Sequence, residues 1–290
     1  MPSMRDIRRR ITSVTNIQQI TRAMKMVAAA KLRRIQGRML AMRPYTQEVA
    51  ALMGRFFPQL MGDEHPLLAQ RDVSRVGIMF LSGESGLCGS HNTNLARKFD
   101  AFADEHKATP LVVGAMGKKA VDHCRRRKID PFAKYVDVYD TMTYTTAVSV
   151  SEKLATAYIG GQFDELYFLF ATFINSMTQE VTLQRILPFD METVPKDRLG
   201  EVPAVYEAEP DAEALAGRLV TEYVTSQTYQ AMLESAGSEH AARMTAMDTA
   251  TTNAEDVTDT LTLDLNRARQ TSITFEILDI VGGAEALRAS

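Results

Sequence analysis

The sequence contains no tryptophan, and aromatic residues make up only 7 % of its 290 positions. Its two cysteines, Cys88 and Cys124, lack the spacing of metal ligands, and a reduced pair of thiols in the cytoplasm is the simplest interpretation. The longest apolar run has six residues, 166–171, far fewer than the roughly 20 that span a bilayer. No apolar region follows the basic N-terminus, so we expect no secretory signal. These absences argue against a membrane-spanning protein and a cysteine metal site.

Proline is scarce in two long stretches of the chain. None follows Pro210, and only Pro44 interrupts residues 3–57. Apolar residues recur in both stretches mostly in steps of three or four, as in amphipathic helices that need a partner. In the first stretch they are Met4, Ile7, Ile11, Val14, Ile17, Ile20, Met24, Val27, Leu32, Ile35, Met39 and Met42. In the second they are Leu215, Leu219, Tyr223, Met232, Ala236, Met244, Met247, Ala250, Ala254, Val257, Leu261, Leu265, Ala268, Ser272 and Phe275.

The two predicted helices have recognisable ends. Pro44 should kink or locally break the first helix and Pro58 should end it. Gly282-Gly283 is the first strong stop signal of the second. Without a break, residues 211–281 would form a helix about 105 Å long. Helices of this length with a heptad-like stripe are typical of coiled coils.

Charge divides between the two ends. Residues 1–55 hold 12 basic and two acidic residues, a net of 12 − 2 = +10, whereas residues 201–290 hold five basic and 16 acidic, a net of 5 − 16 = −11. The opposite signs suggest two helices that wrap around each other. The clusters at 8–10 and 31–34 could also contact nucleic-acid phosphates. No aromatic residue precedes Tyr45 to stack on bases, so an acidic protein surface explains the charge at least as well.

The middle of the chain alternates strands and helices. We expect strands at 76–81, 111–113 and 135–138, helices at 92–105, 116–127 and 145–159, and a hairpin of 163–175 and 178–187 that turns at Asn175-Ser176. This order predicts a parallel sheet with crossover helices. The expected divisions are an N-terminal coiled-coil helix (1–57), a linker (58–74), an α/β domain (75–190), a linker (191–210) and a C-terminal coiled-coil helix (211–290).

Two glycine-rich loops are the main candidates for ligand chemistry. Residues 83–89 have the spacing G-x-x-G-x-x-G, and residues 114–119 read GAMGKK, so neither matches a dinucleotide or phosphate-loop motif. Tight turns that pack a helix on a strand are the simpler interpretation. Ser85 or Cys88 with His91 as a base would lack an orienting acid, and the five histidines show no metal spacing. The sequence therefore predicts no catalytic residue, cofactor or metal ligand.

Four segments, taken together, resemble one family. They are RAMKMVAAAK at 22–31, the loop at 82–92, ESAGSEHAARMTAM at 234–247, and LNRARQTSIT at 265–274 followed by EILDIVGGA at 276–284. In order and spacing they are similar to the gamma subunit of the bacterial rotary, proton-translocating ATP synthase. In that family an Asp-Arg pair usually precedes Gly-Leu-Cys-Gly, whereas residues 82–85 here read SGES. This departure puts local contacts in doubt, among them those with the epsilon subunit.

The resemblance implies a central stalk: an antiparallel coiled coil of N- and C-terminal helices with an inserted Rossmann-like α/β domain. The stalk would turn inside a ring of three alpha and three beta subunits. Its foot would stand on the membrane c-ring with the epsilon subunit, at the cytoplasmic face of the inner membrane. The chain itself would be non-catalytic, would not insert into the membrane and would bind no nucleic acid.

The resemblance also implies roles for particular residues. Contacts that transmit torque to beta subunits would involve Arg8, Arg9, Met24, Lys25, Arg269, Gln270 and Thr274. Residues 1–20 and 273–287 would form the end furthest from the membrane. An apolar sleeve of the ring would there surround Ile273, Phe275, Ile277, Leu278, Ile280 and Val281, which cover nearly the whole helix circumference. The alternatives are a nucleotide-binding α/β enzyme with coiled-coil arms and a coiled-coil adaptor that does not rotate.

The apolar end leads to a prediction about the isolated chain. Because nearly every side of the helix at 273–281 is apolar, one helix partner cannot cover it, and we expect the purified chain to self-associate. Sedimentation of the chain over a range of concentrations measures this association. A monodisperse monomer at high concentration would contradict the prediction.

Overall fold

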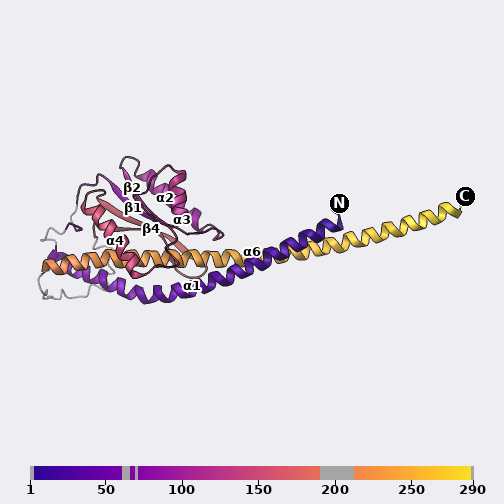
Figure 1. Ribbon diagram of the computed structural model, residues 1–290, viewed down its shortest axis with the longest axis horizontal. Helices are drawn as coiled ribbons and strands as arrows, with labels where there is room; N and C mark the ends of the chain where they lie inside the picture. The colour runs from indigo at the N-terminus through magenta and orange to yellow at the C-terminus, as the bar shows by residue number, and fades with distance from the viewer. Residues whose placement is uncertain (1–2, 61–65, 69–70, 190–211, 289–290) are drawn as a thin grey trace. The chain divides into compact units, whose positions relative to one another are not determined.

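The computed structural model describes residues 3–60, 66–68, 71–189 and 212–288. The chain divides into two compact units: residues Met1–Val27 with Met244–Ser290, and residues Ala28–Arg243. Two long helices, α1 (Met4–Leu60) and α6 (Ala212–Arg288), contribute to both units (Figure 1). The other elements lie in the second unit and are β1 (Val76–Leu81), α2 (His91–Glu105), β2 (Leu111–Met116), α3 (Lys118–Arg126), β3 (Ala133–Tyr135), α4 (Tyr144–Ile159), β4 (Glu165–Phe173) and β5 (Gln179–Leu187).

The long helices are more continuous than the sequence predicted. Helix α1 passes through Pro44 without a break and ends at Leu60, two residues beyond Pro58. Pro44 and Leu40 are exposed, so water can bond the Leu40 carbonyl that loses its N–H partner. The predicted stop at Gly282-Gly283 is also wrong, because α6 continues to Arg288. Glycine inside a helix costs only about 1 kcal/mol relative to alanine, so it weakens a helix without ending it.

The five strands of the Ala28–Arg243 unit form one sheet in the order β3-β2-β1-β4-β5. The first four are parallel, and β5 pairs antiparallel with β4 as the second arm of the predicted hairpin. The predicted strand at 135–138 is misplaced: β3 ends at Tyr135, Val136 is exposed, and Asp137 has a φ of 56°, which strands do not use. With these changes the inserted Rossmann-like α/β domain is confirmed.

The sheet is covered by helices on both faces. Helices α2 and α3 contribute Phe99 and Cys124 to a buried core with Ile78 and Phe80 of β1. The chain reverses its direction across the sheet between β3 and β4, and since crossovers are right-handed, α4 lies on the opposite face. The carboxyl ends of β1 and β4, where this reversal occurs, are the place where open α/β folds usually bind ligands.

Helix α6 lies across those strand ends. The Ser238 hydroxyl donates to the Ala171 carbonyl at 2.8 Å, and the Phe173 N–H donates to the Glu234 carboxylate at 2.8 Å. Helix α1 adds its own bonds, because Arg43 of α1 donates to the Phe173 carbonyl of β4 at 2.9 Å and also pairs with Glu234 at 2.9 Å. The sheet domain is therefore fixed to both long helices.

Helices α1 and α6 also pair within the Met1–Val27, Met244–Ser290 unit, and they run antiparallel. Thr21 contacts Thr251 at 2.8 Å between hydroxyl oxygens, and Lys25 contacts Asp248 at 2.6 Å. Buried and half-buried positions alternate in steps of three and four, the heptad repeat of a left-handed coiled coil. On α1 they include Met4, Ile7, Ile11, Val14, Gln18, Thr21 and Lys25, and on α6 Met247, Thr251, Ala254, Thr258, Leu261, Leu265, Ala268 and Ser272.

The residues that lie between α1 and α6 differ in part from the predicted apolar stripe. Ile17, Ile20 and Val27 are more than half exposed, while Gln18 and Thr21 occupy the seam. The 3.5-residue repeat alone decides which positions face the partner helix, and these positions need not be apolar. The antiparallel coiled coil of N- and C-terminal helices is confirmed, but with a more polar contact than expected.

The polar seam generates a prediction for Thr21 and Thr251. Removing one hydroxyl of this partly buried pair costs up to about 0.5–1.5 kcal/mol, whereas replacing both by apolar groups of the same shape is near neutral or stabilising. We expect Thr21→Val/Thr251→Val to be more stable than either single variant. Hydrogen exchange of the amides at 18–25 and 247–254 measures the local opening free energy. Faster exchange in the double variant than in both single variants would contradict this account.

Candidate functional site

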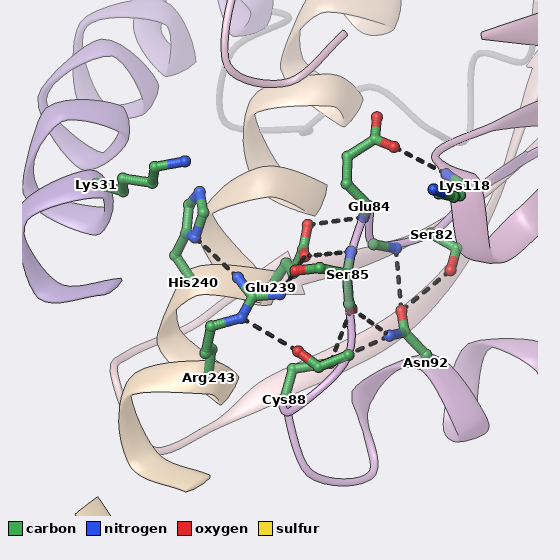
Figure 2. A network of polar contacts seen from close by, with 12 residues as sticks. Lys31, Ser82, Glu84, Ser85, Cys88, Asn92, Lys118, Glu239, His240 and Arg243 are labelled. Atoms are coloured by element: carbon green, nitrogen blue, oxygen red, sulfur yellow. Dashed lines mark hydrogen bonds and ion pairs between the residues drawn. The ribbon is translucent and has the colours of Figure 1, made fainter. Parts of the chain in front are cut away.

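The loop between β1 and α2 contains the first of the two glycine-rich segments that were the main candidates for ligand chemistry. It leaves β1 at Leu81 and enters α2 at His91. At Gly83 a Cβ atom would lie 2.9 Å from the Glu239 carboxyl carbon, and at Gly117, whose φ is 89°, it would lie 2.0 Å from the Ser82 carbonyl oxygen. Glycine at these positions lets the loop approach both α6 and the start of α3 (Figure 2).

The Glu239 carboxylate of α6 occupies the anion position of this loop. The backbone N–H groups of Glu84 and Ser85 each donate to it at 3.2 Å, and the Ser85 hydroxyl lies 3.4 Å away. The Arg243 guanidinium, one helical turn on, completes the set with a short ion pair. Burial alone would raise the pKa of Glu239, but Arg243 and the loop N–H groups outweigh it and hold the pKa below its usual value.

Arg243 connects this carboxylate to more of the loop. Its Nη2 donates to the Ser85 hydroxyl at 2.5 Å and its Nε to the Gly86 carbonyl at 3.3 Å. Its Nη1 lies 3.2 Å from Nδ1 of His240. Burial, together with the Arg243 cation, lowers the pKa of His240, so the neutral ring accepts from the guanidinium through Nδ1. Both charged side chains are therefore satisfied internally.

Glu84, within the segment that departs from the resembled family, has its own structural contacts. Its carboxylate accepts from the Lys118 N–H at 2.9 Å, at the first residue of α3, and from the Val138 N–H at 3.2 Å. A carboxylate at a helix N-terminus is favourable because it meets unpaired N–H groups and the positive end of the helix dipole. The altered loop thus links three segments within this chain.

The candidate nucleophile and base are not arranged for catalysis. Burial raises the pKa of the Cys88 thiol and lowers the pKa of His91 to about 4. The Cys88 thiol contacts the Ser85 carbonyl and the Asn92 amide rather than the His91 ring. Within the described ranges, no three His, Cys, Asp or Glu side chains are grouped to hold a metal ion.

A cavity of about 260 Å³ lies beside the network. Its charged lining has both signs: Lys31, Lys118 and Arg243 face Glu84, Asp137, Asp140 and Glu239. A phosphate-bearing ligand would meet these carboxylates, and the loop N–H groups that could bind it are already bonded to Glu239. The geometry therefore disfavours the nucleotide-binding alternative.

The predicted torque residues on α1 differ in how free they are. Arg8 and Arg9 are exposed, and neither forms an ion pair with any described residue. Met24 is half-buried beside the seam, and Lys25 is paired with Asp248. Lys25 is thus partly committed to the coiled coil, which the sequence did not reveal.

The predicted residues on α6 are all exposed. Arg269, Gln270 and Thr274 lie within two turns, and the Thr274 hydroxyl donates to the Gln270 carbonyl at 3.0 Å. The apolar tip residues have the following exposed fractions: Ile273 49 %, Phe275 62 %, Ile277 54 %, Leu278 58 %, Ile280 71 % and Val281 50 %.

The two helix ends that were predicted to lie furthest from the membrane differ in their packing. The seam on α6 ends at Ser272, and every residue from 273 to 284 is exposed. Within this unit the C-terminal end of α6 continues past the start of α1 at Met4 (Figure 1). The heptad register explains this, because Thr21 opposite Thr251 places Met4 near residue 268.

The Glu239–Arg243 pair is the feature that sequence reasoning missed. Its spacing of four residues predicts a helical ion pair, but such pairs are common on exposed surfaces. Only the position of α6 over the loop after β1 shows that this one is buried.

These features define a class of protein in which two long helices flank an inserted α/β domain in the sequence, and in which the second of these helices fills the ligand crevice of that domain. A protein-family model described as ATP synthase matches residues 3–287. An ATP synthase gamma chain of Desulfitobacterium hafniense is 42 % identical over 288 residues, covering 99 % of this chain and 100 % of the relative. The gamma chain of Pelotomaculum thermopropionicum is 40 % identical with the same coverage.

Solved structures show the same fold. The central stalk and c-ring structure of Tetrahymena thermophila mitochondrial ATP synthase matches with a TM-score of 0.62 at 24 % identity, covering 80 % of this chain and 99 % of that one. A Euglena gracilis mitochondrial ATP synthase structure matches with a TM-score of 0.66 at 20 % identity, covering 99 % and 95 %. The chain belongs to the ATP synthase gamma chain family. No helix of the described residues is both long and apolar enough to cross a membrane.

The buried pair leads to a prediction about stability. Removing one partner of a buried ion pair leaves an uncompensated charge, so Glu239→Ala should cost about 3–5 kcal/mol. Glu239→Leu/Arg243→Met should cost less than the sum of its single variants, because no lone charge remains. Urea unfolding of the purified variants tests this, and additive costs would contradict it.

The lowered pKa of Glu239 sets the sign of a pH effect. A carboxyl whose folded-state pKa is depressed contributes stability that is full above its unfolded pKa, about 4.5, and is lost as pH falls through the folded value. We expect Glu239→Gln to be less stable at neutral pH but to lose less stability than the unaltered chain on acidification below about pH 4.5. Parallel acid profiles would contradict this account.

Proposed function

We propose that this chain is the central-stalk rotor subunit of an ATP synthase, coupling proton flow through the membrane c-ring to ATP synthesis at catalytic sites on beta subunits. The observation that carries the proposal is the exposed end of α6, where six apolar residues between positions 273 and 281 are exposed and no described helix covers them. Such a surface on a soluble protein marks an interaction site. In this proposal residues 1–57 and 211–290 act as the shaft, and residues 75–190 form its lateral domain.

The apolar tip suits a bearing. Ile273, Phe275 and Ile280 are exposed, and an apolar sleeve formed by three alpha and three beta subunits would cover them. Apolar contact is non-directional and roughly proportional to area, so it changes little when one surface turns inside another. Few strong directional bonds would have to break at each angle.

Torque requires contacts that do change with angle. Arg8 and Arg9 offer unpaired positive charge to acidic lever loops on beta, and Arg269, Gln270 and Thr274 offer a polar patch to one beta subunit at a time. Each exposed pair contributes less than about 1 kcal/mol, so several must act together. Because the shaft is asymmetric, each angle would favour different conformations of the three catalytic sites. Lys25 would have to exchange Asp248 for a beta carboxylate.

The chain itself would be non-catalytic, with ATP chemistry confined to beta. Support comes from Glu239, which fills the anion position of the loop after β1. The epsilon subunit and the c-ring would bind the foot of the stalk at the cytoplasmic face of the inner membrane. Equilibrium titration of the isolated chain with ATP and NAD tests the enzyme alternative, and tight binding of either would favour it.

Reversal of charge at Arg8, Arg9 and Arg10 to Glu should weaken coupling while leaving the α/β domain folded. These side chains are exposed on α1 and form no ion pair with any described residue, although Arg9 and Arg10 help to lower the pKa of the exposed Asp6. The change therefore chiefly removes attraction to acidic loops. ATP-driven proton pumping per ATP hydrolysed, in the reconstituted complex, is the measurement.

A matched control is Arg97→Glu/Lys98→Glu/Lys153→Glu, which changes net charge equally at exposed positions of α2 and α4. We expect this variant to pump normally. Unchanged pumping in the α1 variant, or an equal loss in the control, would contradict the torque assignment.

A further inference from the structure

Two tyrosines of the Ala28–Arg243 unit donate to one carboxylate oxygen. The Tyr45 hydroxyl of α1 donates to Oε1 of Glu222 on α6 at 2.6 Å, and the hydroxyl of Tyr144, the first residue of α4, donates to the same oxygen. Because each phenol oxygen lies within hydrogen-bond distance of this one atom, the two phenol oxygens are separated by about 6 Å at most. Three helices therefore meet at a carboxylate that holds two phenols side by side.

This arrangement favours removal of one electron from each phenol. The bond to Glu222 and then burial raise the pKa of the Tyr45 phenol, and burial and the same carboxylate raise the pKa of Tyr144, so both phenols keep their protons at neutral pH. A phenol that loses an electron must also release its proton, and a base already bonded to it assists this step. Tyr45 is 45 % exposed, so an oxidant in solution reaches it, and the chain contains no tryptophan to compete as an electron donor.

Other tyrosines of this unit lack part of this arrangement. Tyr229 packs edge-on against Tyr144 with ring centroids 5.4 Å apart, but its hydroxyl accepts from the Arg38 guanidinium, and a cation beside a phenol opposes loss of an electron. Tyr167 donates to Glu165 at 3.0 Å, but its ring contacts a phenylalanine rather than another tyrosine. Neither combines a bonded base with a second phenol on the same base.

We propose that Tyr45 and Tyr144 form an oxidative modification site, at which a one-electron oxidant converts the two phenols into a dityrosine cross-link between α1 and α4. Each phenol gives one electron to an oxidant molecule and one proton to Glu222 or, through it, to water. The two phenoxyl radicals then form a bond between an ortho carbon of each ring. Each of these carbons loses its hydrogen as a proton, and each phenoxyl oxygen takes a proton up. The product therefore has two hydrogen atoms fewer than the two tyrosines.

The cross-link would have a measurable effect on the fold. It would join residues separated by 144 − 45 = 99 positions in the sequence and hold α1 to the start of α4. Closing a loop of this length reduces the conformational entropy of the unfolded chain, so the cross-linked chain should unfold at a higher temperature. The inference concerns contacts within one chain and does not depend on the proposed rotor function.

The test uses the purified full chain and photogenerated tris(bipyridyl)ruthenium(III), a one-electron oxidant, with persulfate as the final electron acceptor. Chains grown in ordinary nitrogen and in heavy nitrogen are mixed in equal amounts before illumination, and cross-linked peptides are identified by mass spectrometry. A link within one chain carries a single nitrogen isotope, whereas links between associated chains include products that carry both. The two kinds of link are thus separated even if the chain self-associates.

We expect the Tyr45–Tyr144 peptide to be the most abundant link within one chain. A positioned base contributes about 10²–10⁴-fold to a proton transfer, and water replaces it in part, so Glu222→Gln should lower the yield of this link at least about tenfold. Glu165→Gln is the matched control, because it neutralises the carboxylate bonded to Tyr167 and should leave the yield unchanged.

Three results would overturn the proposal. A dominant link between Tyr144 and Tyr229 would show that ring packing, not the shared carboxylate, selects the pair. An unchanged yield in Glu222→Gln would remove the role of its carboxylate, and links found only between chains would exclude the site altogether. Circular dichroism checks that each variant is folded. If Glu222→Gln unfolds, the positions of the links in the unaltered chain still decide which tyrosines pair.

Discussion

The buried carboxylate of Glu239 is the interaction on which the Ala28–Arg243 unit depends. A charge removed from water costs several kcal/mol unless it is paired and hydrogen-bonded, and Glu239 satisfies this need with Arg243 and the loop after β1. Because both residues lie on α6, a slide of α6 along the sheet edge would keep them paired with each other but would remove the bonds that the loop after β1 makes to both side chains. The network thus fixes the register between long helix and lateral domain, which apolar packing alone specifies less strictly. The loop N–H groups that could bind an anion bind the Glu239 carboxylate instead, and so attach α6 to the α/β domain.

The seam between α1 and α6 in the other unit follows a different rule. Its heptad spacing keeps the helices in contact, but Gln18, Thr21 and Thr251 replace the large apolar residues of a strong coiled coil. Threonines of α6, Thr249, Thr258 and Thr262 among them, bond the carbonyl four residues earlier, which slightly weakens and bends helices. Polar residues in a seam specify register at the expense of stability. This unit is therefore paired in register without being rigidly packed.

The sequence predicted those features that repeat along the chain. Alternating strands and helices placed the α/β domain because its patterns are local, and proline scarcity located both long helices. Pattern reasoning failed where the outcome depends on contacts distant in sequence. Thr21 rather than Ile20 lies in the contact between the helices, because the heptad geometry of the pair decides which positions face the partner. Pro44 did not break α1 because water can bond the freed carbonyl on an exposed face. From sequence alone the Glu239–Arg243 pair cannot be distinguished from an exposed ion pair. In the fold, the loop after β1 covers it.

The opposite charges of the two ends now have a more specific meaning. Several basic residues of α1 in the Ala28–Arg243 unit form contacts within the chain: Lys31 binds Asp140 at 2.8 Å, and Arg38 donates to the Met142 carbonyl at 2.6 Å. Arg8 and Arg9 have no such partner among the described residues. Since salt screens exposed charges beyond about 8–10 Å, their attraction acts only on a surface that comes close. The force on an acidic loop would therefore depend on the rotational angle, if the loop approaches these arginines at one angle and withdraws at the next. Evenly spaced ion pairs between two helices of the same chain could not supply such a force.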